Sequence, residues 1–538
     1  MNIRQKTVFF QPIIFSLLIG IIYTIPFLST KGALYGSDLF FHIDRMRSFS
    51  NILSSPINFD TFYNSGQPIN IFYPWLTFYP FYLINLITHS IWSAWYIYIA
   101  FITSISAYIA YYSYNGIFND NKSSYVFSLL YIFTSYRLDN IFSRFAAGEV
   151  VAFTFLPLIF YGLFLIIKSD YKKWPILTVG MTLTMYTHIL SVVMSALVIA
   201  IILITSFAFW DNKVKRILAF TYATGATLLL SAFAYIPMLE QLINLKIEKP
   251  AILDLNDWAK NISQIINSSL DNSIVDHVPG LVFIISLIIL LLIWNKLSDL
   301  QKYIVGIGLF CLFLTTNFIP WGFLSKFHLN IIQFPFRFNI YSVLFISAAL
   351  TSTVKKVNKK YIISLFLILT VLHSGTVLRG IRLKSTSPVI PPRELSVRNS
   401  LYNLTHSYYQ TDYANELLIK NEEKKSYRQK IWNHEVYENN KLVPSKAKFT
   451  AESASFTVNN IKGKIYLPTY YYKGQYVLVN GKPIKSNLSP WGSTQIFSKQ
   501  PIKNIKISYR YSTIAKLSVI ISAISSLLLI SYMFKQKK

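Results

Sequence analysis

The sequence is poor in charged residues and almost free of cysteine. Only 14% of its 538 residues are charged, against about 25% in average soluble domains, which argues against an ordinary soluble enzyme. The single cysteine, Cys311, lies inside an apolar run, so neither a disulfide framework nor a cysteine-based metal site is expected. The motifs HExxH, GxSxG, GxxxxGK(S/T) and CxxC are also missing. Metalloprotease, serine hydrolase and nucleotide-hydrolysing functions therefore lack their characteristic residues.

Long apolar runs dominate the sequence instead. Hydrophobic residues make up 53% of the chain, and the mean hydropathy is +0.40. The first run, Pro12–Leu28, follows Arg4 and Lys6 without a small-residue cleavage site after it, so we expect a retained first helix. The further candidate spans are 92–113, 124–136, 148–167, 175–187, 189–209, 217–238, 279–294, 302–318, 336–353, 361–378 and 514–534. These runs predict an α-helical polytopic membrane protein with about 12 spans.

Lysine and arginine in the short loops predict the orientation. The basic clusters are Lys168/Lys172/Lys173, Lys213/Lys215/Arg216, Lys296/Lys302, Lys355/Lys356/Lys359/Lys360 and the tail Lys535/Lys537/Lys538. The positive-inside rule places these clusters and both termini in the cytoplasm, with an even number of spans between any two clusters. Residues 72–88 break this parity if they cross, and their prolines and aromatic residues favour a juxtamembrane or re-entrant element. A true crossing, offset by loss of a short span such as 124–136, is the alternative.

The domain organisation follows from this topology. Residues 1–378 form a transmembrane module with a first outer loop at 29–91, and residues 514–538 form the last helix and a basic tail. Between them, 379–513 is extracytoplasmic and holds 22 Lys and Arg against 8 Asp and Glu, about half of the net charge of +28. Its second half alternates in polarity and contains Asn480-Gly481, a strong hairpin signal, so we expect a small β-sandwich.

The first group of candidate functional residues follows the first helix. Ser37 is a good helix N-cap, and Asp38, His42 and Arg45 then share one helix face at i, i+4 and i+7. A carboxylate beside an imidazole can take a proton from a hydroxyl or hold a cation. A capping aspartate with an interfacial His–Arg face is the alternative.

A second group lies at the outer mouth of the span 148–167. Arg137 and Arg144 suit a phosphate group, because guanidinium binds phosphate through two parallel hydrogen bonds. Simple interfacial salt bridges, Arg137 with Asp139 and Arg144 with Glu149, explain the same charges equally well. Glu149 reaches deepest into the apolar run and is the hardest of these residues to explain structurally.

Three further residues lie at the same predicted membrane surface. His188 stands at the outer junction of two spans, where a hydrogen-bonded turn residue is the alternative to a ligand-binding one. Gln333 and Arg337 flank Phe334-Pro335-Phe336 at the entrance of the span 336–353, and snorkelling of the arginine to lipid head groups is the alternative there. The convergence of these groups on one surface points to a site. Asp38, His42 and Glu149 are also possible ligands of a divalent cation, although no metal is assigned.

The same residues carry a family resemblance. Gly36-Ser37-Asp38 with His42, Arg144 with Glu149, His188 with Leu190-Ser191, and Gln333–Arg337 resemble a bacterial membrane family labelled "6-pyruvoyl-tetrahydropterin synthase-related". The ending from Leu467 through Asn480-Gly481 to Tyr509 resembles YfhO-type proteins, and the whole layout resembles the GT-C class of membrane glycosyltransferases. Phe336 replaces a frequent tryptophan, and Lys473-Gly474 replaces a typical Pro-Gly. Pterin synthases are soluble zinc enzymes, and no comparable histidine cluster is present here.

The resemblance implies a GT-C-type transferase in the bacterial plasma membrane. It would move a sugar from a polyprenyl-phosphate donor to a cell-surface glycopolymer, such as teichoic acid or polysaccharide, on the outer face. Asp38 would be the general base, Arg144 and Arg337 would hold the donor phosphate, and His42 and Glu149 would orient the acceptor or the base. The basic outer domain suits an anionic polymer and, being outside the cell, not a nucleic acid. A non-catalytic assembly protein, or a flippase or polymerase of lipid-linked oligosaccharides, is the alternative.

Overall fold

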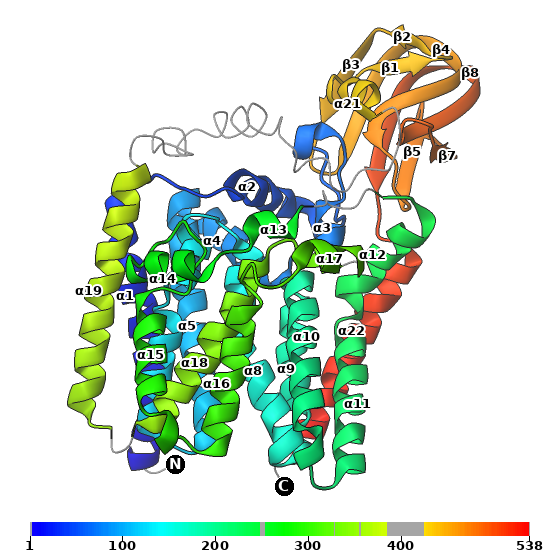
Figure 1. Cartoon of the computed structure of the whole chain (residues 1–538). Coiled ribbons are helices and arrows are strands. Elements are labelled where there is room, and N and C mark those ends of the chain that lie inside the picture. The colour runs from blue at the N-terminus through cyan, green and yellow to red at the C-terminus, as the bar shows by residue number, and fades with distance from the viewer. Residues whose placement is uncertain (1–2, 248–252, 328, 355–356, 385–423, 537–538) are drawn as a thin grey trace. The chain divides into compact units, whose positions relative to one another are not determined.

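The computed structural model describes residues 3–247, 253–327, 329–354, 357–384 and 424–536 (Figure 1). Its internal contacts divide the chain into two compact units. We call Met1–Leu39, Leu83–Thr227 and Ile252–Ser396 the helical unit, and Phe40–Tyr82, Leu228–Ala251 and Val397–Lys538 the β unit. This division differs from the predicted one, because two segments of the predicted transmembrane module group with the outer domain and the last helix. Residues 385–423 of the predicted outer stretch lie outside the described residues.

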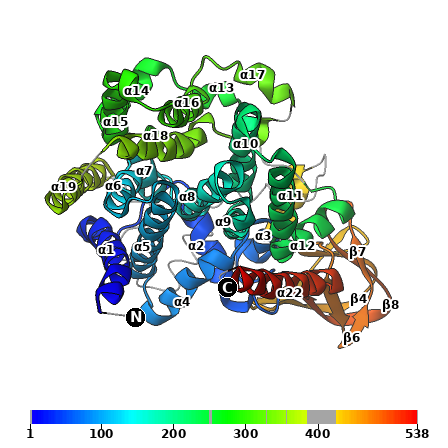
Figure 2. The ribbon, with the colours of Figure 1, turned by 90° about the horizontal axis from the view of Figure 1, so that it is seen from below.

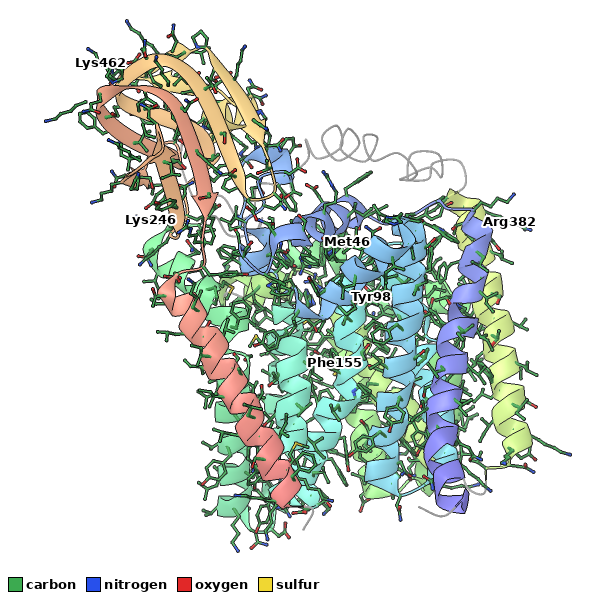
Figure 3. The ribbon with its side chains drawn as sticks, turned by 180° about the vertical axis from the view of Figure 1, so that it is seen from behind. Met46, Tyr98, Phe155, Lys246, Arg382 and Lys462 are labelled. Carbon is green, nitrogen blue, oxygen red and sulfur yellow. The ribbon has the colours of Figure 1, made fainter. Side chains whose placement is uncertain are left out.

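The helical unit is a bundle of apolar helices. Its long elements are α1 (Ile3–Thr24), α5 (Ile91–Phe118), α6 (Asn121–Ile132), α8 (Ala147–Lys168), α9 (Pro175–Met185), α10 (Ile189–Ser206), α15 (Leu281–Leu292), α16 (Asp299–Phe313), α18 (Asn339–Thr353) and α19 (Lys359–Lys384). Small residues let them approach closely: a Cβ on Gly20 of α1 would lie 2.3 Å from the Ala100 carbonyl oxygen of α5. In Figure 3 the labelled side chains of Tyr98 and Phe155 lie within this bundle, and both are buried.

Among the described residues, six helices are long and apolar enough to cross a membrane. They are Gln11–Thr30 (α1 with the following 3-10 turn), α5, α8, Ile189–Phe209 (α10 with a 3-10 turn), α19 and α22 (Thr513–Lys535). A seventh is reached if α11 (Lys213–Leu230) and α12 (Ala232–Asn244), interrupted at Ser231, are taken as one span. The expected count of about 12 is therefore not confirmed. Five predicted spans form α6, α9, α15, α16 and α18, of 11 to 15 residues, and a 15-residue helix is only about 22 Å long.

The segment 72–88 contains no long helix. It forms a 3-10 turn at Leu76–Phe78 and the ten-residue helix α4 (Tyr79–Thr88). Ten residues are about half of what a straight crossing needs.

Basic residues mark one end of the helical unit. The connections α8–α9, α10–α11 and α15–α16, the end of α18 and the start of α19 all lie at the lower end of the bundle in Figure 1. The described basic residues there are Lys168, Lys172, Lys173, Lys213, Lys215, Arg216, Lys296, Lys302, Lys359 and Lys360, which gather at one end of this unit, as the parity of the spans predicts. The short helices α13 (Leu255–Trp258), α14 (Ile262–Leu270) and α17 (Trp321–Leu324) lie at the opposite end.

The β unit contains one eight-stranded antiparallel sheet. Its strands are β1 (Val436–Glu438), β2 (Lys441–Val443), β3 (Ser445–Phe449), β4 (Ser453–Tyr470), β5 (Gln475–Val479), β6 (Lys482–Ile484), β7 (Ser486–Leu488) and β8 (Ser493–Tyr509). The long β4–β8 pair contains three register shifts, which bend a ribbon, and its inward side chains, such as Phe456, Ile465 and Ile505, form a core. The predicted hairpin is confirmed: Asn480 (φ 48°) and Gly481 (φ 81°) join β5 to β6.

Earlier segments of the chain complete the β unit. Asn51 donates to the carbonyl of Ala451 (2.8 Å), and Tyr470 donates its backbone N–H to Ser65 (2.9 Å). Helix α12 packs on α22, where Ser512, the N-cap of α22, donates to Glu240 (2.6 Å). In Figure 3 Lys462 lies at the far end of the sheet from Lys246, which follows α12. The sheet, the segment Phe40–Tyr82 and the last helix thus form one body.

Candidate active site

Glu149 is the centre of a buried polar cluster in the helical unit. It lies in the first turn of α8, where the helix dipole favours a carboxylate. One carboxylate oxygen accepts hydrogen bonds from Arg144 Nη1 (3.0 Å) and from Arg337 Nε (3.4 Å), and the other accepts one from the Tyr136 hydroxyl. Glu149, Arg144 and Arg337 are 4%, 7% and 8% exposed, so one carboxylate holds two buried guanidinium groups. These three side chains together therefore carry a net positive charge.

Local structure fixes each arginine from its own side. Arg144 follows α7 (Ser135–Phe142), and its Nη1 also donates to Asn140 Oδ1, one helical turn back (2.5 Å). Arg337 lies in the 3-10 turn Pro335–Phe338, and its Nη1 donates to the carbonyl of Ile332 and to Gln333 Oε1, both at 2.8 Å. Besides Glu149, one hydrogen-bonded partner holds Arg144 and two hold Arg337, and these bonds prevent both guanidinium groups from snorkelling to the surface.

Asp38 is fastened to the same cluster by its backbone. Its N–H donates to the carbonyl of Arg144 (2.9 Å), and the N–H of Ser37 donates to Ser143 (3.2 Å). This close approach needs Gly36: its φ is 134°, and a Cβ there would lie 2.4 Å from Cβ of Phe145. As a residue Asp38 is half-buried, whereas Glu149 is buried. Asp38 is thus the acid of the cluster that an incoming molecule can reach.

The surroundings of Asp38 change its acidity. Burial raises the pKa of Asp38 above its usual value, against the opposing effects of Arg144, of the Ser37 hydroxyl and of Arg337. The Ser37 hydroxyl donates to Asp38 Oδ1 over 3.2 Å. A carboxylate with a raised pKa is a stronger proton acceptor than one in water, provided that it stays ionised at the working pH.

Aromatic rings form one wall of the cluster. The guanidinium of Arg144 lies over the ring of Phe336 (5.0 Å), and that of Arg337 lies over Phe334 (4.9 Å). The two rings stack on each other at 4.9 Å, and Trp258 packs edge-on against Phe334. Cation–π contacts hold both guanidinium planes and leave the wall apolar.

Other predicted residues of the helical unit have different surroundings. Arg137 is completely buried and donates to Thr103 (2.8 Å), with its guanidinium over the ring of Tyr23. Among the described residues it forms no salt bridge with Asp139. The carboxylate of Asp139 instead lies 2.6 Å from His277 Nδ1. The sequence suggested two salt bridges here, Arg137–Asp139 and Arg144–Glu149. Among the described residues only Arg144–Glu149 forms.

His188 precedes α10, and its Nδ1 lies 2.8 Å from the Ser191 hydroxyl, as in a hydrogen-bonded turn. Its ring also lies against Gly148, where a Cβ would come within 2.9 Å of it. The neighbour of Gly148 is Glu149, so His188 borders the cluster, and a glycine at 148 makes this approach possible.

His42 and Arg45 belong to the β unit, on α2 (Leu39–Arg47). Arg45 is 1% exposed and donates to the carbonyls of Tyr73 (3.3 Å) and Pro74 (2.5 Å), so it holds the segment 70–78 in place. His42 is buried and stacks on Phe78 at 5.8 Å. Within this unit, both side chains serve the packing of the segment Phe40–Tyr82.

The structure adds residues that the sequence did not single out as site members. Tyr136 and Asn140 hydrogen-bond Glu149 and Arg144, respectively, and a signal existed for both, since they lie four residues apart on α7, eight and four residues before Arg144. His277 had no such signal, because it is isolated in sequence and its partner Asp139 is distant along the chain. Within the described ranges, no group of three or more His, Cys, Asp or Glu side chains could hold a metal ion.

Comparison with known proteins identifies the family. Residues 71–380, more than half of the chain, match the family described as "6-pyruvoyl-tetrahydropterin synthase related domain; membrane protein". The match includes Arg144, Glu149 and Arg337 but not Asp38. No curated protein and no solved structure gives a significant match. The chain therefore belongs to the 6-pyruvoyl-tetrahydropterin synthase related family of membrane proteins.

Proposed function

We propose that this protein is a membrane glycosyltransferase that moves a sugar from a polyprenyl-phosphate donor to a cell-surface glycopolymer. One observation carries the proposal: a half-buried carboxylate, Asp38, is fastened to a buried cluster in which Glu149 holds Arg144 and Arg337 side by side. A proton acceptor next to paired guanidinium groups is what transfer from a phosphate-linked donor requires.

Each residue of the site has its own role in the proposed reaction. The acceptor hydroxyl gives its proton to the Asp38 carboxylate while its oxygen bonds to the anomeric carbon of the sugar. The bond between that carbon and the donor phosphate oxygen breaks, and polyprenyl phosphate leaves. Arg144 and Arg337 bind the phosphate and stabilise the charge that develops on it. Glu149 keeps the two guanidinium groups fixed, so that little reorganisation is needed during the reaction.

The proposed orientation follows from the charge of the two ends of the helical unit. With the basic connections in the cytoplasm, as the positive-inside rule favours, the Glu149 cluster would face the outer side of a bacterial plasma membrane. No nucleotide sugar is available there, so a lipid-linked donor fits that side of the membrane.

An anionic surface polymer is the proposed acceptor. Residues 424–512 hold 16 Lys and Arg against 3 Asp and Glu. A surface of that sign attracts a polyanion such as teichoic acid or an acidic polysaccharide, and concentrates it near the membrane.

Asp38→Asn tests the proposal. The change keeps size and polarity but removes the proton acceptor, so transfer of labelled sugar from polyprenyl phosphate to the surface polymer should fall by about 10²–10⁴-fold. Asp60→Asn, at an exposed aspartate of the β unit, is the matched control and should transfer at the wild-type rate. Normal transfer by a well-expressed Asp38→Asn variant would contradict a catalytic role. Build-up of lipid-linked sugar on the inner leaflet after gene deletion would indicate a flippase instead.

A further inference from the structure

A large apolar cavity lies in the helical unit, at the end where the basic connections gather. Its volume is about 490 Å³. The lining comes from the last turns of α5, α8 and α10, the first turns of α16, and the middle of α6 and α18. Figure 2 shows the ribbon of these helices from below, the end at which the basic connections lie. Rings of Phe127, Phe160 and Phe345 make up much of its wall. This lining is far along α8 from Glu149, so the cavity is separate from the candidate active site.

The length of the cavity matches one leaflet of a bilayer. Along α8 the lining runs from Pro157 to Lys168, a rise of about 16 Å. Half of a hydrocarbon core is about 15 Å thick. The cavity is not sealed, because the lining side chains Phe209 and Leu300 are 80% and 41% exposed. The cavity therefore opens at the end where Phe209 and Leu300 lie.

One end of the cavity has the chemistry of a membrane–water interface. Lys168 ends α8 there, and Trp210 and Tyr303, residues that prefer the interface, line the same end. The Trp210 indole donates to Ser206 (2.9 Å), and the Tyr303 hydroxyl pairs with Thr205 (2.7 Å). The apolar end and the polar end thus lie in the order in which a lipid presents its tail and its head group.

The charge at that end selects the kind of head group. Asp299 also lines the cavity, and its negative charge offsets the positive charge of Lys168. The described residues of the four basic clusters at this end nevertheless hold 10 Lys and Arg against 3 Asp, in the ranges 168–173, 211–216, 296–302 and 357–360. Basic pockets between membrane helices favour anionic lipid heads over zwitterionic ones.

We infer that this cavity is a binding site for an anionic glycerophospholipid, with one acyl chain between α8, α10 and α18 and its phosphate at Lys168. The site is independent of the proposed transferase reaction, because it lies at the other end of the bundle. Its occupant fills a space that would otherwise leave apolar side chains without contacts, and so it supports the bundle from the leaflet that faces the basic loops.

Native mass spectrometry of the purified full-length protein tests the site. The delipidated protein is mixed with phosphatidylglycerol or with phosphatidylcholine of the same chains, and the bound lipid is counted. Ala348→Phe fills the cavity, whereas Ala200→Phe puts the same ring on an exposed position of α10. Lys168→Gln removes the charge at the cavity, and Lys173→Gln removes one outside its lining. Thermal unfolding of each variant shows whether it is folded.

The wild type, Ala200→Phe and Lys173→Gln should each retain phosphatidylglycerol in preference to phosphatidylcholine. Ala348→Phe should lose most of the retained lipid, and Lys168→Gln should lose the preference for the anionic head. Equal retention by Ala348→Phe and the wild type would overturn the site. An unchanged head-group preference in Lys168→Gln, or the same loss in Lys173→Gln, would overturn the assignment of the phosphate to Lys168.

Discussion

The two units of this protein carry their positive charge in different ways. In the helical unit the guanidinium groups of Arg144 and Arg337 are buried, share the Glu149 carboxylate and lie over aromatic rings. In the β unit the charge is mostly lysine on the outward side of a sheet, as at Lys446, Lys448 and Lys506, all of which are exposed.

The difference teaches what each kind of charge can do. A guanidinium held on several sides has a fixed direction, so it can recognise a phosphate by geometry and stabilise charge as it develops. A lysine on an exposed strand has a flexible stem and a solvated head, so it attracts any nearby anion and is screened by salt. Specific binding is therefore expected from the helical unit, and attraction without fine geometry from the β unit.

Breaking the arginine cluster at its centre should have the largest effect. Glu149→Gln leaves two buried guanidinium groups without their carboxylate, and the loss of one partner from a buried ion pair costs about 3–5 kcal/mol. We expect a clear fall in the thermal unfolding temperature of the purified protein. Glu452→Gln, at an exposed glutamate of the β unit, should change stability by no more than about 0.5 kcal/mol. Equal stability of the two variants would show that the cluster is not held together by Glu149.

Removing one guanidinium should weaken donor binding while the fold remains. Arg337→Ala loses a charge-assisted contact to the donor phosphate, worth about 1.5–3 kcal/mol, so the KM for polyprenyl-phosphate sugar should rise about 10- to 150-fold. Arg337→Lys keeps the charge but not the planar pair of donors, so its KM should lie between those of the wild type and Arg337→Ala. Lys326→Ala, at an exposed lysine in the same unit, is the control. An unchanged KM in Arg337→Ala would contradict its role in donor binding.

Changing the surroundings of Asp38 should have a smaller effect, seen as a shift of the acid limb of the pH–rate profile. Since burial raises the pKa of Asp38, the rate should fall on the acid side at a pH above the ordinary aspartate value of 3.8, as the base becomes protonated. The Ser37 hydroxyl bond stabilises the carboxylate and lowers its pKa, so Ser37→Ala should move this acid limb to still higher pH. Ser37→Thr keeps a hydroxyl and should retain the wild-type limb. A pH profile of kcat/KM that is identical in all three proteins would argue against Asp38 as the base.

Features that depend on neighbouring residues could be predicted from the sequence. Asn480-Gly481 specifies its hairpin because both residues need positive φ, and the alternation around it specifies strands. The arrangement of the units could not be predicted in this way. The bonds from Asn51 to Ala451 and from Tyr511 to Ile52 join segments hundreds of residues apart, so no local pattern shows that the segment Phe40–Tyr82 belongs with the sheet.

The candidate site shows the same limit. Arg144 and Glu149 are five residues apart, and their pairing was one of two interpretations of the local charges. That Arg337 reaches the same carboxylate depends on how the chain before α18 packs beside α8. Sequence spacing alone could not distinguish Arg144 and Arg337 from the other buried arginines. Arg45 binds backbone carbonyls and Arg137 binds a threonine. Burial explains an arginine only together with its partners.

The lysines of the sheet should give the smallest effect per residue and the one that salt abolishes. Lys448 on β3 and Lys506 on β8 both lie opposite Ser455 of β4, so they face the same side about 10 Å apart. Lys446→Gln, Lys448→Gln and Lys506→Gln should each weaken binding of the anionic acceptor about fivefold or less, the range of exposed ion pairs. The triple variant should differ from the wild type at low salt and match it at high salt, because exposed charges are screened. The donor KM of Arg337→Ala should stay raised at both salt concentrations, since its partners are buried. If the lysine variants also lose binding at high salt, the sheet recognises its partner by geometry, and the contrast between the two units fails.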